Sequence, residues 1–289
     1  MGILLILLSS LSFALSSYFG KIATNTTSMS GVINSFSRFL VGTVFMFIYM
    51  VYKGKKFKAP DIKPIFYRAL FNSFAIILFS ASIKYTTITN VNMLNMIYPV
   101  FVILLAPFFL KEPIKKSTYV YLAIIMAGSY IVADPSFGNI NIGDFLAFMS
   151  SLMAAFSIMY LKKAREENEG YLIVFYVMFI GAAINIPFAY KDISSFEIAG
   201  AFPIFMAGLM GFLGQVFITW GYKYVDSATG ALVSTSRIII GGVIGYLLLN
   251  EPLTVKIIVG MLMITLSLIG ISGYFDKKKE KTDEIEELQ

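Results

Sequence analysis

IKYTTITNVNMLNMIYPVFVILLAPFFLKEP (Ile83–Pro113) and YKYVDSATGALVSTSRIIIGGVIGYLLLNEP (Tyr222–Pro252) are two copies of one pattern in a single chain. Each copy has a lysine–tyrosine pair, a polar stretch, a long apolar run and a final Glu-Pro. Aligned without a gap, they share five residues at a constant offset of 139 positions: Lys84/Lys223, Tyr85/Tyr224, Leu110/Leu249, Glu112/Glu251 and Pro113/Pro252. The offset is close to half of the 289 residues, so the pattern predicts an internal duplication.

The composition places this duplicated chain in a membrane. Hydrophobic residues make up 57% of the sequence and charged residues only 14%, whereas a soluble domain carries about 25% charged residues. The chain has neither cysteine nor histidine, which removes thiolate nucleophiles, the commonest metal ligand and the commonest proton shuttle. We therefore expect no metal site, no cofactor and no enzymatic activity.

The net charge of +6 is gathered in lysine clusters between apolar runs. This distribution indicates membrane topology rather than a nucleic-acid partner. If the N-terminus is cytoplasmic, the connections on its side hold seventeen lysines and arginines, and those on the other side hold four, namely Lys21, Lys84, Lys191 and Lys256. Cytoplasmic connections are enriched in these residues, so both termini are expected in the cytoplasm, with the chain in the cell (plasma) membrane.

Ten runs are apolar and long enough to be read as membrane-spanning helices, for which about 20 residues are needed. They cover Gly2–Phe19, Val32–Tyr52, Ile65–Ser82, Ile88–Leu110, Thr118–Val132, Ile142–Leu161, Tyr171–Tyr190, Ile198–Tyr222, Ala228–Leu249 and Val255–Tyr274. Ten spans divide into five plus five, and a unit with an odd number of spans must insert its second copy upside down. The expected fold is therefore an all-α membrane protein of two inverted five-helix repeats, residues 1–138 and 139–275, with a charged cytoplasmic tail at 276–289. Such repeats are a transporter design in which substrate binds near the bilayer midplane.

Three motifs give the chain a family resemblance: SFSRFLVG (Ser35–Gly42), LKEP (Leu110–Pro113) and STSRIIIGGVIGYLLLNEPL (Ser234–Leu253). With ten spans in two repeats, the chain resembles the drug/metabolite transporter superfamily, and its EamA-like permeases in particular. The resemblance implies a central cavity and alternating access, with small organic metabolites such as amino acids, vitamins or nucleotide sugars as substrates, often carried outward. The tryptophan common in the first span of these relatives is absent here, and Phe13 or Tyr18 occupies that region.

Arg237 is the sharpest candidate for a substrate-binding residue, because it lies near the middle of an apolar span. An arginine at that depth is costly unless it faces a wet cavity or a partner. Its repeat equivalent is Tyr98, so two related helices place a guanidinium and a phenol near the midplane. A guanidinium binds carboxylate or phosphate through two parallel hydrogen bonds. The alternative is that Arg237 ties helices together through backbone carbonyls.

Other polar or aromatic residues lie at helical spacing around this pair and complete the predicted substrate site. Small and amide residues also mediate helix packing in lipid, and for the serines that alternative is favoured. The set consists of Asn72, Asn92, Asn95, Gln215, Ser234 and Phe13.

A second group is assigned to gating or structure rather than to substrate. Arg38 lies a turn or two inside the outer end of its span, where a long cation can reach the surface. Each Glu-Pro pair closes a span, with proline ending the helix and glutamate free to pair with a lysine or cap a helix. The group consists of Arg38, Glu112, Pro113, Glu251, Pro252 and Pro99.

The leading hypothesis is a secondary transporter, an exporter or exchanger, of a small organic metabolite with a carboxylate or other anionic group, such as an amino acid. No aspartate or glutamate falls at mid-span, which argues against proton coupling. The alternatives are a non-transporting partner subunit or a flippase-like protein, and, less favoured, a membrane transferase. The partners expected are a small-molecule substrate and the bilayer, and a homodimer is left open.

Overall fold

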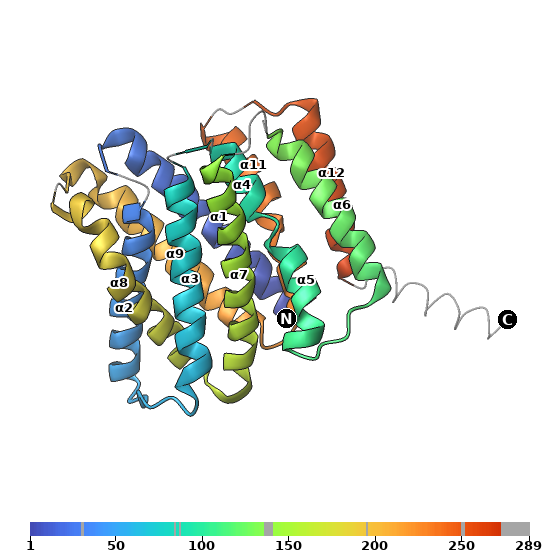
Figure 1. The fold of residues 1–289 in the computed structure, drawn as a ribbon. Helices are drawn as coiled ribbons and strands as arrows, with labels where there is room; N and C mark the ends of the chain where they lie inside the picture. The colour runs from blue at the N-terminus through green and yellow to red at the C-terminus, as the bar shows by residue number, and fades with distance from the viewer. Residues whose placement is uncertain are drawn as a thin grey trace.

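The computed structural model describes residues 1–29, 32–83, 85–86, 88–135, 141–194, 196–249 and 252–272 of the chain. Over these residues the regular secondary structure is helical throughout (Figure 1). The first half contains α1 (Gly2–Thr26), α2 (Val32–Tyr52), α3 (Ile62–Ser82), α4 (Ile88–Asn95), α5 (Tyr98–Phe109) and α6 (Lys116–Ala133). The second half contains α7 (Ile142–Glu167), α8 (Gly170–Ser194), the 3₁₀ turn η1 (Ile198–Gly200), α9 (Ala201–Gly221), α10 (Ser227–Ser234), α11 (Ser236–Leu249) and α12 (Val255–Ile271).

These helices form the ten expected spans. In the described part of the chain, nine helical stretches are long and apolar enough to cross a bilayer, and α12 adds a shorter apolar helix of 17 residues. A spanning helix needs about 17–25 residues, so the expected all-α membrane fold is confirmed. α1 and α7 continue beyond their predicted ends at Phe19 and Leu161, to Thr26 and Glu167, because helical structure persists past the apolar part of each run.

Spans 4 and 9 are each broken in the middle, contrary to the continuous helices expected over Ile88–Leu110 and Ala228–Leu249. α4 ends before Met96 and α5 begins at Tyr98, while α10 and α11 are separated by Thr235 alone. The offset of 139 residues places Met96 on Thr235. The break is therefore a feature of the repeat and occurs at the same point in both copies.

Different local chemistry produces the two breaks. Pro99, the second residue of α5, has no N–H to donate to the preceding turn and disfavours helical geometry just before it. In the second copy the Ser234 hydroxyl donates to Gly230 O (2.8 Å) and the Thr235 hydroxyl to Leu232 O (2.6 Å). Such side-chain bonds offer the carbonyls an alternative to the helical ladder.

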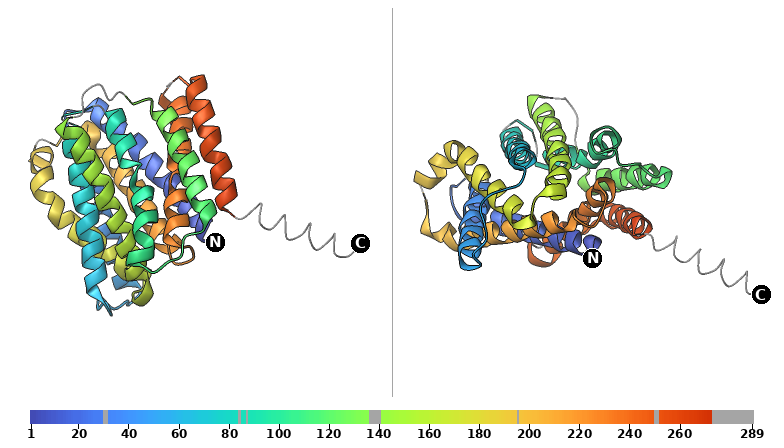
Figure 2. Two further views of the ribbon diagram at one scale, coloured as in Figure 1. Left: turned by 45° about the vertical axis from the view of Figure 1, so that its right-hand side comes forward. Right: turned by 90° about the horizontal axis from the view of Figure 1, so that it is seen from below.

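The two halves interlock along their whole length (Figures 1 and 2). α3 packs along α7 and α1 packs along α9, so the third span of each half contacts the first span of the other. α2 contacts α8, α5 contacts α10, and α6 contacts α12, so these spans pair with their own repeat equivalents. A two-fold relation between inverted repeats produces this set of pairs.

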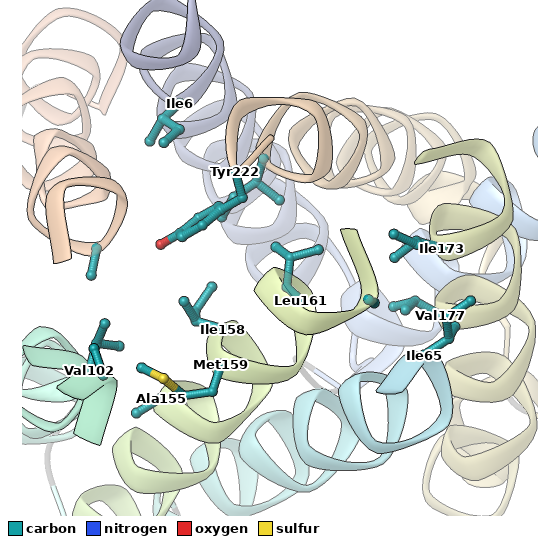
Figure 3. Close-up of a cluster of buried hydrophobic side chains, with 14 of the residues drawn as sticks. Ile6, Ile65, Val102, Ala155, Ile158, Met159, Leu161, Ile173, Val177 and Tyr222 are labelled. Carbon is teal, nitrogen blue, oxygen red and sulfur yellow. The ribbon is translucent and has the colours of Figure 1, made fainter. Parts of the chain in front are cut away.

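An apolar cluster, which we call the inner seal, closes one end of the bundle (Figure 3). This end, the N-terminal face, carries the start of α1 and the connections 53–61, 110–115, 168–169 and 222–226. The inner seal draws side chains from seven helices or their ends: Ile6, Ile65, Ala69, Val102, Ala106, Ala155, Ile158, Met159, Leu161, Ala164, Ile173, Val177, Ile218, Tyr222, Ala231 and Val233. These side chains pack together in the part of the bundle nearest this end.

Candidate functional site

Tyr98 and Arg237 occupy the first turn after the two helix breaks. Tyr98 is the first residue of α5, and Arg237 is the second residue of α11. The Tyr98 phenol donates a hydrogen bond across the repeat boundary to Ala231 O of α10 (3.2 Å), and its ring lies close to Ser234 and to the Arg237 charge. The structure therefore brings together three of the residues predicted for the substrate site.

Arg237 forms no hydrogen bond or ion pair with the described residues. Its side chain is half-buried, and no described residue accepts a hydrogen bond from its guanidinium. It also lies in the first turn of α11, where the helix dipole is positive. Broken helices in transporters present such N-termini to anionic groups of the substrate.

Arg38 of α2 points into the bundle rather than toward the membrane surface. Its guanidinium lies over the rings of Phe39 (4.9 Å to the centroid) and Phe13 of α1 (5.9 Å). The Nε and Nη2 atoms are buried, and neither has a hydrogen-bond partner among the described residues. The stem of the side chain packs on Gly211 of α9, where an added Cβ would lie 2.6 Å from Arg38 Cδ.

One face of α1 links the two arginines. The Ser10 hydroxyl donates to Ser234 O (3.4 Å), three residues before Arg237, and Phe13 lies one turn further along α1 beneath Arg38. The charges of Arg38 and Arg237 are close enough to repel each other. The two arginines come from opposite halves of the chain, and Arg38 lies over Phe13.

The four predicted amide residues have different environments. Asn95 donates to the Ser150 hydroxyl (2.8 Å), which donates in turn to Ala75 O (2.9 Å), so Asn95 joins α4 to α7 and α3. Gln215 is only 2% exposed, and its Nε2 has no partner among the described residues. Asn72 Nδ2 is likewise buried without a partner, whereas Asn92 is exposed.

Arg68 is a buried residue that the sequence analysis missed, because it was counted with the cytoplasmic connections. Asp61 accepts a hydrogen bond from Lys63 N (3.0 Å) and starts α3 at Ile62, which places Arg68 two turns inside the helix and 3% exposed. Its guanidinium donates to the Ser157 hydroxyl of α7, which donates back to Arg68 O (3.2 Å). The aspartate N-cap was the signal that could have located it.

Glu112 joins the two repeats at the N-terminal face. Its Oε2 accepts hydrogen bonds from the backbone N (2.8 Å) and hydroxyl (2.5 Å) of Ser227, the first residue of α10. Its Oε1 lies 3.7 Å from Lys162 Nζ, which also donates to Val225 O (2.5 Å). We call this group the inner latch; the neighboring Pro113 and the equivalent Pro252 are exposed, and Glu251 lies outside the described residues.

No group of three or more acidic residues in the described part of the chain could hold a metal ion. Asp144, a buried acid at the start of α7, is engaged locally: it accepts from the Thr86 hydroxyl (2.7 Å) and from Asn141 N (3.1 Å). Among the described residues it forms no ion pair with Arg38 or Arg237.

Comparison with known proteins gives one consistent result. The model of the EamA-like transporter family matches the chain twice, over residues 1–133 and 141–273. An uncharacterized transporter of Helicobacter pylori is 26% identical over 277 residues, covering 92% of both chains. The pseudopaline exporter of Pseudomonas aeruginosa is 22% identical over 94% of this chain and 95% of its own. The S-adenosylmethionine uptake transporter of Rickettsia conorii is 23% identical over 75% and 74%.

A solved crystal structure has the same fold, with a TM-score of 0.74 over 96% of this chain and 98% of the other, at 12% identity.

Proposed function

Because this chain belongs to the EamA-like transporter family, we propose that it is a secondary carrier of a small organic metabolite with an anionic group, held at the two helix breaks. The family and the named relatives are transporters, and the chain is a multi-pass membrane protein. The direction proposed is export or exchange. In this proposal the repeats meet between residues 138 and 139, and alternating access exposes the center to each side in turn.

The observation that best supports an anionic substrate is that the Arg237 guanidinium has no hydrogen-bond partner among the described residues. A charge at mid-bilayer costs about 2.5–3.5 kcal/mol on insertion scales unless it is paired or hydrated. Arg237 has no hydrogen-bonding partner in the described part of the chain, and Gln215 and Asn72, on α9 and α3, have buried N–H donors that lack acceptors among the described residues. Unpartnered guanidinium and amide N–H groups suit a ligand that supplies carboxylate or phosphate oxygens.

The test replaces Arg237 and measures ligand binding and flux. Purified protein would be screened by thermal shift against acetate, glycine, glutamate, succinate and phosphate, because a ligand that binds the folded state raises the melting temperature. We expect Arg237→Ala to abolish the shift produced by the best anion and its flux in liposomes, with a normal folded yield. Arg237→Lys should rescue poorly, since an ammonium cannot present a planar fork.

Two outcomes would contradict the proposal. Normal flux by well-folded Arg237→Ala would remove this residue from the site. Aggregation of Arg237→Ala, together with full binding and flux by Arg237→Lys, would instead assign Arg237 to helix packing.

A further inference from the structure

We propose that Arg38 is a second anion-binding residue of this site, so that the carried metabolite bears two negatively charged groups, such as two carboxylates. This inference rests on the function proposed above and deepens it. The sequence analysis placed Arg38 near the outer end of its span and assigned it to gating or anchoring. The structure instead directs its guanidinium toward the center, over Phe13.

The Arg38 guanidinium has buried N–H donors that a ligand can bond to. Its Nε and Nη2 are buried and have no acceptor among the described residues. The two aromatic faces beneath it, Phe39 at 4.9 Å and Phe13 at 5.9 Å, attract a cation but accept no ordinary hydrogen bonds. Removing a charge from water costs several kcal/mol unless opposite charge and hydrogen bonds replace the lost hydration.

Arg68 in the same bundle has a hydrogen-bonding side chain on a neighboring helix, although its Nε is also buried without a partner among the described residues. Its guanidinium donates to Ser157 of the neighboring helix, and the Ser157 hydroxyl returns a hydrogen bond to Arg68 O. Arg38 and Arg237 have no such arrangement with the described residues. The buried acid Asp144 accepts hydrogen bonds from Thr86 and Asn141. The compensating charge for both arginines is therefore assigned to the ligand.

The geometry permits one ligand to reach both arginines. Arg38 lies over Phe13, and Ser10, one turn earlier on the same face of α1, bonds to Ser234 beside Arg237. Gly211 leaves room for the Arg38 stem, since any Cβ at that position would displace it. Each guanidinium offers a planar fork of donors that matches one carboxylate. A small molecule with an acidic group at each end fits this arrangement.

The experiment compares dicarboxylates with monocarboxylates of equal chain length. Purified full-length protein would be titrated with malonate, succinate, glutarate, adipate and pimelate, and with propionate, butyrate, valerate, caproate and heptanoate, at constant ionic strength. The readout is the thermal shift and the Kd obtained from it. We expect one dicarboxylate length to bind about tenfold or more tightly than its monocarboxylate, as one added charge-assisted contact provides.

Arg38→Gln should remove this advantage while leaving monocarboxylate binding within about twofold of wild type. Arg165→Gln is the matched control, because it removes one positive charge from α7 at the N-terminal face, where Arg165 bonds to Asn168 O (3.3 Å); it should keep the advantage. If Arg38→Gln fails to fold, Gly211→Ala takes its place, since it displaces the Arg38 stem and keeps the charge.

The outcomes separate this inference from the proposed function. A dicarboxylate advantage that survives Arg38→Gln, or survives Gly211→Ala where that variant is used, overturns the role of Arg38. Equal binding of mono- and dicarboxylates by wild type, with Arg237→Ala still abolishing both, rejects the second subsite and leaves the anionic carrier intact. Carboxylate binding that is unaffected by Arg237→Ala rejects the proposed function itself.

Discussion

At the scale of the residue, Glu112 shows how one carboxylate can join two halves of a duplicated chain. It ends the fourth span of the first repeat, yet its hydrogen bonds go to Ser227, 115 residues later, at the start of α10. A carboxylate at a helix N-terminus also interacts favorably with the helix dipole. Lys162 completes the group from a third helix. The inner latch therefore holds the connection 110–115 to the start of α10 and to α7 through one side chain.

We expect Glu112→Ala to lower the free energy of unfolding by about 1–3 kcal/mol, because Ser227 N and Lys162 lose a charged acceptor. Thermal or denaturant unfolding in detergent measures the change. Glu166→Ala, at an exposed position on α7, is the control and should fall within about 0.5 kcal/mol of wild type. Equal stabilities for the two variants would show that the inner latch contributes nothing to the fold.

The residues of the site could be predicted from the sequence only in part. Arg237 and Tyr98 were predicted because an apolar run shows how deep in the bilayer each residue lies, and polar residues at mid-depth are rare. The inward direction of the Arg38 side chain could not be predicted from the sequence, because it depends on Phe13 and Gly211, which lie on other helices. The partner of Glu112 was hidden for the same reason: Ser227 approaches it only when the halves interlock.

At the scale of the element, the paired breaks in spans 4 and 9 determine where the site can form. Pro99 is a signal that could have indicated the first break, which the sequence analysis did not predict, and the ninth span contains no proline. There the serine and threonine hydroxyls take the place of the missing proline. Hydropathy cannot distinguish a broken span from a continuous one, since both halves of the span are apolar. The ten spans and their inverted arrangement, by contrast, follow from hydropathy and from the repeat.

The contact between α6 and α12 offers a test of an element's packing. A Cβ on Gly260 would lie 2.5 Å from Gly128 O, so the two backbones touch directly. We expect Gly260→Ala to lower the free energy of unfolding by about 1–3 kcal/mol through overpacking. Gly241→Ala on α11 is the control, because nothing lies within 4 Å of its Cβ, and it should be neutral or stabilizing by up to about 1 kcal/mol. Thermal unfolding compares the two, and a stabilized Gly260→Ala would refute the close contact.

At the scale of the whole molecule, contacts between the halves occur at both ends. The inner latch and the inner seal close the N-terminal face. At the other end Glu197, before α9, accepts from Ser28 N (2.9 Å) and the Ser28 hydroxyl (2.5 Å), after α1. These bonds lower the pKa of Glu197, so this contact is intact above the ordinary carboxyl range and weakens as the pH falls through the lowered value. Alternating access requires such contacts to open at one end at a time.

The orientation in the membrane can be tested with single cysteines, since the chain has none of its own. Tyr85→Cys and Lys56→Cys place thiols at exposed positions at opposite ends of the molecule. With the N-terminus cytoplasmic, as the lysine and arginine bias predicts, a membrane-impermeant maleimide should label Tyr85→Cys in intact cells. Lys56→Cys should react only after lysis. Labeling in the opposite order would reverse the predicted topology.

Arg38 belongs to the first repeat and Arg237 to the second, so in this proposal a ligand that binds both arginines bridges the two repeats. In the proposed cycle the empty carrier has two positive charges with no ligand between them. A doubly charged ligand neutralizes both by bridging the two arginines. A ligand can favor a conformation only by the difference in its affinity for the two states. The interconversion would then be easy for the loaded protein and hard for the empty one. Such a carrier exchanges one substrate molecule for another and does not change conformation readily without substrate.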